Sequence, residues 1–123
     1  MPDHPNAIAA RQAIDAMERG DMQAMADYVA DDVVWHVIGS SEPIRGKAAL
    51  QAAMTGADYE ITSHVHDVVA NDDHTIVLAE NTATRGDKSL TYRTAEITHV
   101  RDGKVVERWA FSDDTQAINE FFS

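Results

Sequence analysis

A carboxylate in the middle of a predicted strand is the first candidate for chemistry in this chain. Within the segment 94–99 side chains alternate between two faces, and Glu96 shares its face with Tyr92 and Thr98. A carboxylate held in a partly dry cavity can donate or accept a proton near neutral pH, whereas a solvated one is an ordinary surface charge. Glu96 is therefore a candidate acid–base group if this face lines a pocket.

A second carboxylate, Glu80, lies on the preceding predicted strand. If it points into the same pocket as Glu96, the two groups could share a proton or bracket a substrate. Alternatively, Glu80 forms a salt bridge with Arg93 or Arg108 and has a structural role. Glu80 is kept as a candidate catalytic residue beside Glu96.

Two histidines, His64 and His66, are two residues apart and share one face of their predicted strand. Such a pair could supply two metal ligands, a general base or polar lining of a pocket, or it could lie on the surface. The spacing of the other residues offers no third ligand, so we predict no metal site. His64 is a candidate acid–base group that assists Glu96.

The last predicted strand also carries polar side chains with two distinct faces. Arg108 and Ser112 share one face, and Trp109 and Phe111 share the other. An inward arginine could orient an anionic or carbonyl group of a ligand, or pair with a nearby glutamate. A register change of one residue would exchange the two faces.

The composition limits the class of protein. A chain of 123 residues with 44% apolar residues predicts one folded domain. There is no cysteine, so disulfides are excluded, and no apolar run or signal-peptide pattern suggests membrane insertion or export. We therefore expect a cytoplasmic protein. The formal charge of −11 argues against nucleic acid and membrane as partners, because both demand a basic face.

The order of elements predicts an α+β fold. Apolar stripes at helical spacing indicate helices, β-branched runs indicate strands, and Asp102-Gly103 is a hairpin signal. A small sheet of long strands must curl, and helices over its concave face would enclose a cavity. A second copy of the chain could cover the convex face, so we expect a homodimer. The predicted helices span about 6–19, 22–29, 46–54 and a short C-terminal segment, and the predicted strands span 33–38, 59–70, 74–85, 89–101 and 104–112.

Three segments, 30–35, 42–46 and 101–109, resemble the nuclear transport factor 2-like superfamily, closest to its SnoaL-like and ketosteroid isomerase-related branch. The resemblance covers essentially the whole chain and implies a single domain, 1–123. The implied fold is a cone-shaped, strongly curved antiparallel sheet with three N-terminal helices that enclose a pocket, and with a short C-terminal helix. It also implies chemistry without a cofactor.

The chain departs from the catalytic residues of these relatives. The resemblance puts Val37 where ketosteroid isomerase has its aspartate base, and Ala13 where that enzyme has its oxyanion tyrosine. Glu96 falls on the position of its protonated carboxylic acid. Ala110 stands where SnoaL-type cyclases have an aspartate. Steroid isomerisation by the known mechanism is therefore not expected.

The resemblance also implies which side chains bind a substrate. The face of Trp35 and the face of Arg108 would line the pocket, with Trp35 as a wall for a flat apolar ligand or as plain core packing. The predicted substrate-binding residues are Trp35, Met54, Tyr92, Arg108 and Ser112.

Three functions stay open at this point. The first is an isomerase, cyclase or lyase that acts on a small, largely apolar carbonyl or enol compound, with Glu96 as the acid–base group. The second is a ligand-binding or structural dimer without catalysis, which a locked salt bridge between inward polar groups would favour. The third is an epoxide hydrolase, which needs a water molecule between two carboxylates such as Glu80 and Glu96.

Overall fold

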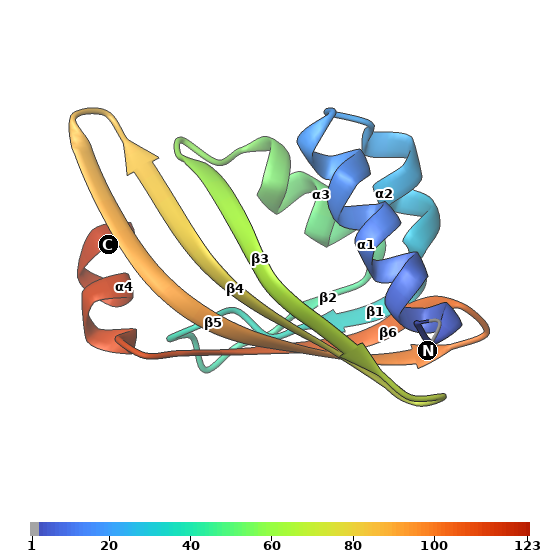
Figure 1. The fold of residues 1–123 in the computed structure, drawn as a ribbon. Helices are drawn as coiled ribbons and strands as arrows, with labels where there is room; N and C mark the ends of the chain where they lie inside the picture. Colours follow the sequence, from blue (N-terminus) through green and yellow to red (C-terminus); the bar gives the residue numbers. More distant parts are fainter. Residues whose placement is uncertain (1–2) are drawn as a thin grey trace.

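The computed structural model describes residues 3–123, which form a single curved sheet with the first three helices over one part of it and the C-terminal helix near its other end (Figure 1). The α+β expectation is confirmed. The helices are α1 (Pro5–Glu18), α2 (Met22–Tyr28), α3 (Lys47–Thr55) and α4 (Thr115–Phe122). The strands are β1 (Val29–Trp35), β2 (Ile44–Arg45), β3 (Glu60–Ala70), β4 (His74–Arg85), β5 (Lys88–Arg101) and β6 (Lys104–Ser112).

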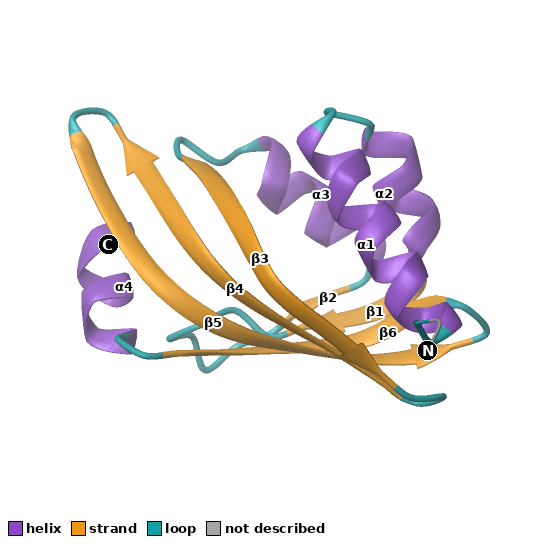
Figure 2. Ribbon diagram, viewed as in Figure 1, coloured by secondary structure: helices purple, strands orange, loops and turns teal. Residues whose placement is uncertain are grey.

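The six strands lie in the order β2-β1-β6-β5-β4-β3. All neighbours are antiparallel except β1 and β6, which run parallel. Figure 2 shows the long strands β3, β4 and β5 bending up and away from β1 and β6, with α1, α2 and α3 above the concave face and α4 near the far end of β5. The curl and the open concave face agree with the predicted cone shape. The sheet is not closed, because β2 and β3 both have a free edge.

The buried face of the first helix partly matches the apolar stripe that helical spacing predicts, at Ile8, Ala10, Ala13, Ile14 and Met17. Ala10 and Ala13 are buried, together with Ala7 and Ala16. Ile14 and Met17 line the cavity between the sheet and the helices, whereas Ile8 is 44% exposed. Small side chains let a helix axis approach its neighbours closely.

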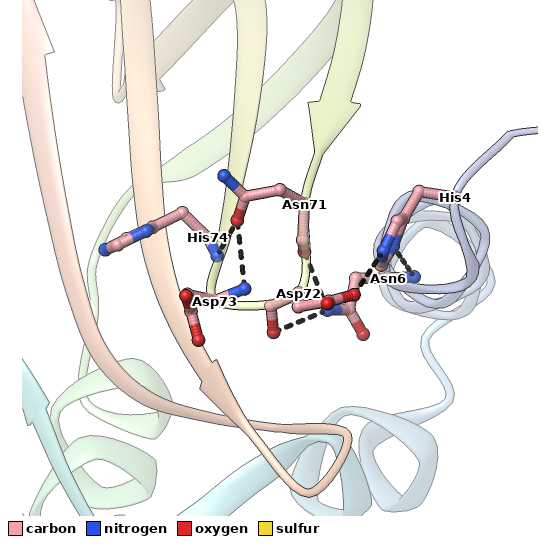
Figure 3. Close-up of polar contacts among 6 residues, drawn as sticks. All are labelled: His4, Asn6, Asn71, Asp72, Asp73 and His74. Carbon is pink, nitrogen blue, oxygen red and sulfur yellow. Dashed lines mark hydrogen bonds and ion pairs between the residues drawn. The ribbon is translucent and has the colours of Figure 1, made fainter.

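The start of α1 is fastened to the β3–β4 hairpin by a set of polar contacts (Figure 3). The His4 ring contacts the Asp72 carboxylate at 2.9 Å, and the Asn6 amide donates to the main-chain oxygens of Asn71 and Asp72. The Asn71 side-chain oxygen accepts two backbone N–H groups across the turn, from Asp73 and His74. The predicted turn at 71–73 therefore also holds the helical layer against one edge of the sheet.

Side-chain caps fix the starts of α2 and α4, whereas α3 follows Gly46 without a side-chain cap. Asp21 accepts from the backbone N–H of Ala24, and Asp114 accepts from that of Ala117, as expected of helix N-caps. The first strand differs from the prediction, since it begins at Val29 directly after α2 and not at residue 33. No helix of the described residues is long and apolar enough to cross a membrane.

The core is divided into small clusters and does not fill the space under the helices. One cluster joins Val29 and Val33 of β1 to Leu50 of α3 and Val105 of β6. A second joins α1 to Val68 of β3, and a third joins Ile118 of α4 to β4 and β5. Between these clusters the concave face of the sheet stays open, and this gap is the candidate site.

Candidate functional site

A cavity of about 670 Å³ lies between the concave face of the sheet and the helices. Its walls are mostly apolar and come from all four helices and from the middle of the long strands. This size accommodates a drug-sized organic molecule. Four of the predicted substrate-binding residues line it: Trp35, Met54, Tyr92 and Arg108. Glu96 lines it as well, so the predicted orientation of the Glu96 face agrees with the structure.

Glu96 is paired with Arg108 inside the cavity. The Nε atom of Arg108 lies 3.2 Å from Oε1 of Glu96, and the two side chains are 14% and 33% exposed. Within the described residues, this Nε has no partner in hydrogen-bond geometry, so the contact is a charge pair only. One side of the carboxylate is thus neutralised. Glu96 nevertheless lines the cavity and is 33% exposed, so a ligand there can reach its carboxylate.

Arg108 is held in place by two further contacts. Its Nη1 donates to the main-chain oxygen of His36 at 2.9 Å, and its guanidinium lies 4.5 Å from the centre of the Trp35 ring. A cation over an indole face is an attractive arrangement, strongest where water is excluded. Arg108 is therefore a fixed group that positions Glu96, and its charge is already engaged.

All three tyrosines of the chain, Tyr28, Tyr59 and Tyr92, line the cavity. Burial, and to a lesser extent the charge of Glu96, raises the pKa of Tyr28 to about 12. Burial is also the main cause of the raised pKa of Tyr92; Tyr59 and Glu96 raise this pKa further, and Arg108 lowers it. These two phenols therefore stay neutral at physiological pH and can donate hydrogen bonds to a ligand.

Sequence reasoning missed Tyr28. It lies where α2 passes directly into β1, and neither a helical stripe nor strand alternation shows which way such a residue points. The signal that could have found it is its residue type. A tyrosine supplies a neutral hydroxyl donor, which is useful in a pocket that also holds a carboxylate such as Glu96.

A chain of uncharged polar groups crosses the concave face at another point. The Ser63 hydroxyl donates to the side-chain oxygen of Asn81 at 2.6 Å, and the Asn81 amide donates to the Thr94 hydroxyl at 2.8 Å. These residues come from β3, β4 and β5, and all three line the cavity. Each side chain of this row has a partner, and the Thr94 hydroxyl, which accepts here, keeps its own proton for donation.

A second ion pair lies at the part of the cavity that is next to α4. The Arg85 side chain donates from Nε to Asp58 at 3.0 Å, and from Nη1 to the main-chain oxygens of Phe121 and Ser123. Tyr59 packs edge-on against Phe122, with ring centres 4.7 Å apart. Arg85 thus joins the end of β4 to the segment before β3 and to the last turn of α4.

The predicted inward placement of Glu80 and His64 is wrong. Directly opposed residues on neighbouring strands point to the same face. Glu80 is opposed to His64 and to Arg93, whereas Glu96 is opposed to Val77 on β4, which lines the cavity. Strand alternation then puts Glu80 on the convex face, because it is three residues from Val77. His64 and Glu80 line a separate hollow there, and Glu80 pairs with Arg93 at 3.7 Å.

Ser112 is the other prediction that the structure corrects. It is not among the residues that line the cavity. Its hydroxyl accepts the backbone N–H of Asp114 at 3.1 Å and lies 3.4 Å from the Asp113 carboxylate, so it belongs to the turn before α4. The other face of β6, which carries Trp109 and Phe111, points away from the cavity as predicted. Trp109 stacks on His36 outside the cavity, and Phe111 is 60% exposed.

The raised pKa of Tyr28 predicts how stability depends on alkaline pH. The unfolded state loses the phenol proton near pH 10 and the folded state only near 12, so the free energy of unfolding falls between these values. Tyr28→Phe removes this contribution. We expect the wild type to lose about 1–2 kcal/mol more than the variant from pH 10 to pH 12 after allowance for solvent screening. Urea unfolding at each pH measures the difference, and equal losses would contradict it.

Comparisons with known proteins agree with this geometry. The family model of the SnoaL-like domain matches residues 10–108. Bal32a, from a soil-derived mobile gene cassette, is 26% identical, with 96% of each chain covered and a TM-score of 0.82. An LEH-like epoxide hydrolase of M. tuberculosis is 18% identical over 96% of this chain and 90% of its own, with a TM-score of 0.77. IdmH of Streptomyces antibioticus, a proposed polyketide cyclase, is 20% identical over 96% and 99%, with a TM-score of 0.73.

No curated protein matches the chain. Since the structural neighbours that have named activities differ in those activities, they establish the fold and leave the reaction open. The matched family model covers most of the chain, and the cone with its pocket is the architecture that the sequence motifs predicted. The chain therefore belongs to the SnoaL-like domain family of the nuclear transport factor 2-like superfamily.

Proposed function

We propose that this protein is a cofactor-independent enzyme of the isomerase, cyclase or lyase type that acts on a small, uncharged carbonyl or enol compound. The observation that carries the proposal is a glutamate, Glu96, in a mostly apolar cavity large enough for an organic ligand. Carboxylates in such surroundings are suited to move a proton between carbon and oxygen positions of a bound molecule.

The charges of the cavity support an uncharged substrate. Among the described residues, four charged side chains line it, and they form two ion pairs: Glu96 with Arg108, and Asp58 with Arg85. Neither arginine is left as a free cation for an anionic group. An anionic ligand would therefore have to displace a partner carboxylate or enter without a counter-charge.

The chemical step follows from these positions. Glu96 removes a proton from the carbon next to a carbonyl group. The electron pair of the broken C–H bond forms a carbon–carbon double bond, and the carbonyl π electrons move to oxygen. The protonated Glu96 can return the proton to the same or another carbon. Arg108 holds the carboxylate in place for both transfers.

A second candidate function, passive ligand binding, is favoured by the same ion pair. An arginine locked to Glu96 favours a binding protein, because a paired carboxylate is less available for proton transfer. The structure shows such a contact, although only through one nitrogen. Hydrolysis of an epoxide between Glu80 and Glu96 is not proposed, because Glu80 lies on the convex face.

Hydrogen exchange tests the proposal against passive binding. We would incubate the protein in D₂O with 2-tetralone, a small uncharged ketone with acidic hydrogens, and with an analogue that carries a carboxylate on its aromatic ring. The proposal expects exchange of the 2-tetralone hydrogens well above the buffer rate and little enhancement for the charged analogue. Binding of 2-tetralone without added exchange would support the passive function. Equal enhancement for both ketones would overturn the proposed substrate class.

A homodimer through the convex face is part of the proposal. Apolar side chains of β4, β5 and β6 lie next to one another there, in the opposed pairs Ile97–Trp109 and Ala95–Phe111, with Leu78 beside them. Phe111 is 60% exposed, and an exposed aromatic on such a patch is typical of an interface.

Phe111→Asp is expected to convert the dimer to a monomer, because it would bury a charge in the contact. Size-exclusion chromatography with light scattering measures the mass. Met22→Asp, at a 54% exposed position of α2 away from this face, is the matched control and should leave the dimer intact. A monomeric wild type, or a dimeric Phe111 variant, would contradict the proposed interface.

A further inference from the structure

Tyr28 is a cavity-facing group that the ion pairs and polar networks of the protein do not use. It is the last residue of α2, immediately before β1. Its ring packs against two core clusters at once, one formed by β1, α3 and β6 and the other by α1 and β3. An aromatic ring held from both sides has few rotamers left, so the hydroxyl group has a fixed position.

Among residues 3–123, the Tyr28 hydroxyl has no hydrogen-bond partner that accounts for its placement. Burial and the nearby Glu96 charge are the influences on it, and no hydrogen bond to a described residue contributes. The hydroxyl is therefore available to hydrogen-bond with a molecule in the mostly apolar cavity that Tyr28 lines. A polar atom of a ligand in the cavity would supply the acceptor.

Tyr28 and Glu96 come from opposite walls of the cavity. Tyr28 belongs to the helical layer and Glu96 to β5, and Figure 1 shows α2 standing above the concave side of the sheet. A flat ligand between the two walls would meet a neutral hydroxyl donor on one side and a carboxylate on the other. These are the two groups that enolisation needs, because charge develops on oxygen while a proton leaves carbon.

We infer that Tyr28 donates a hydrogen bond to the carbonyl oxygen of the ligand while Glu96 faces the adjacent carbon. This rests on the proposed function. As Glu96 takes the proton from carbon, the C–H pair becomes the carbon–carbon double bond and the carbonyl π pair moves to the oxygen that Tyr28 holds. The Tyr28 proton stays on the phenol, and the proton on Glu96 returns to carbon in the second half of the reaction.

The two other tyrosines are less suited to this role. Tyr92 is 7% exposed, packs with Ile118 in the cluster under α4, and lies in the field of both Arg108 and Glu96. Tyr59 is 38% exposed and packs against Phe122. Tyr59 therefore offers a matched control that lines the same cavity.

The test uses 4-dimethylaminocinnamaldehyde, an uncharged aldehyde whose absorption moves to longer wavelength when its carbonyl oxygen receives a hydrogen bond. We expect the wild type to bind this probe with a red shift. Tyr28→Phe, which removes only the hydroxyl, should abolish most of the shift and weaken binding about 5–10-fold. Tyr59→Phe should retain both. A probe of the same shape without the carbonyl should bind wild type and Tyr28→Phe equally.

Each result separates this inference from the proposed reaction. A full red shift in Tyr28→Phe, or a wild type that binds the aldehyde without a shift or not at all, would overturn the role of Tyr28. Loss of the shift in Tyr28→Phe supports it even if no hydrogen exchange is found, because the readout is a ground-state hydrogen bond. In that case the anchoring role would stand and the reaction would fail. Thermal unfolding of Tyr28→Phe checks that the fold is kept.

Discussion

Glu96→Gln is expected to lower the rate of hydrogen exchange from 2-tetralone by about 10²–10⁴-fold, the usual contribution of general acid–base catalysis. Glutamine has nearly the shape of glutamate and keeps an oxygen beside Arg108, but it cannot accept a proton from carbon. The cavity and its pairing residue are therefore retained while the base is removed. Proton NMR of the ketone in D₂O measures the rate.

A matched control separates this effect from a general change of charge in the cavity. Asp58 also lines the cavity and is paired with an arginine, but it lies beside α4 and away from Tyr28 and Glu96. Asp58→Asn should change the exchange rate by no more than about twofold. A Glu96→Gln variant with the wild-type rate, or an equal loss in Asp58→Asn, would refute Glu96 as the base.

The second large effect concerns stability. Arg108→Met is expected to lower the free energy of unfolding by roughly 2–3 kcal/mol, because it leaves the Glu96 carboxylate in the cavity without its counter-charge. Complete burial would cost more, but Glu96 is 33% exposed and water screens part of the loss. The variant also loses the contacts of the guanidinium with the Trp35 ring and the His36 main chain.

A double variant identifies the source of the loss. If the unpaired carboxylate dominates, Glu96→Gln together with Arg108→Met should be more stable than Arg108→Met alone by about 1–2 kcal/mol. Arg93→Met is the matched control, since Arg93 pairs with Glu80 at the exposed convex face and should cost about 0.5 kcal/mol or less. Urea unfolding gives all four values. A double variant as unstable as Arg108→Met would show that the charge pair is not the cause.

The helices, strands and turns could be predicted from the sequence because their signals are local. Strand alternation, turn residues such as those at 71–73, and helix caps such as Asp21 and Asp114 each act over a few residues. The two-residue strand β2 was missed because a pair of residues carries no periodicity. The predicted stripe of α1 included the buried Ala10 and Ala13 but not Ala7 and Ala16, because hydrophobicity scales favour larger side chains, whereas close helix packing selects small ones.

The candidate site was only partly predictable, since it depends on which face of each strand turns inward. For Glu96, Trp35, Tyr92 and Arg108 the family motifs supplied the correct register. For Glu80 the family match gave the wrong face of β4, and His64 was chosen from the spacing of two histidines alone, which does not say which face of β3 turns inward. The structure opposes these two residues across β3 and β4, so both lie on the convex face. No property of the isolated strands reveals this, because both faces of β4 contain apolar and polar residues.

The most direct measurement is a crystal structure of the protein with 2-naphthol, which has the shape of the enol of 2-tetralone. We predict the naphthol in the cavity, with its oxygen about 3 Å from the Tyr28 hydroxyl and the neighbouring ring carbon facing the Glu96 carboxylate. A naphthol bound elsewhere, or one whose oxygen contacts Arg108 while its ring carbon points away from Glu96, would contradict the proposed chemistry of this cavity.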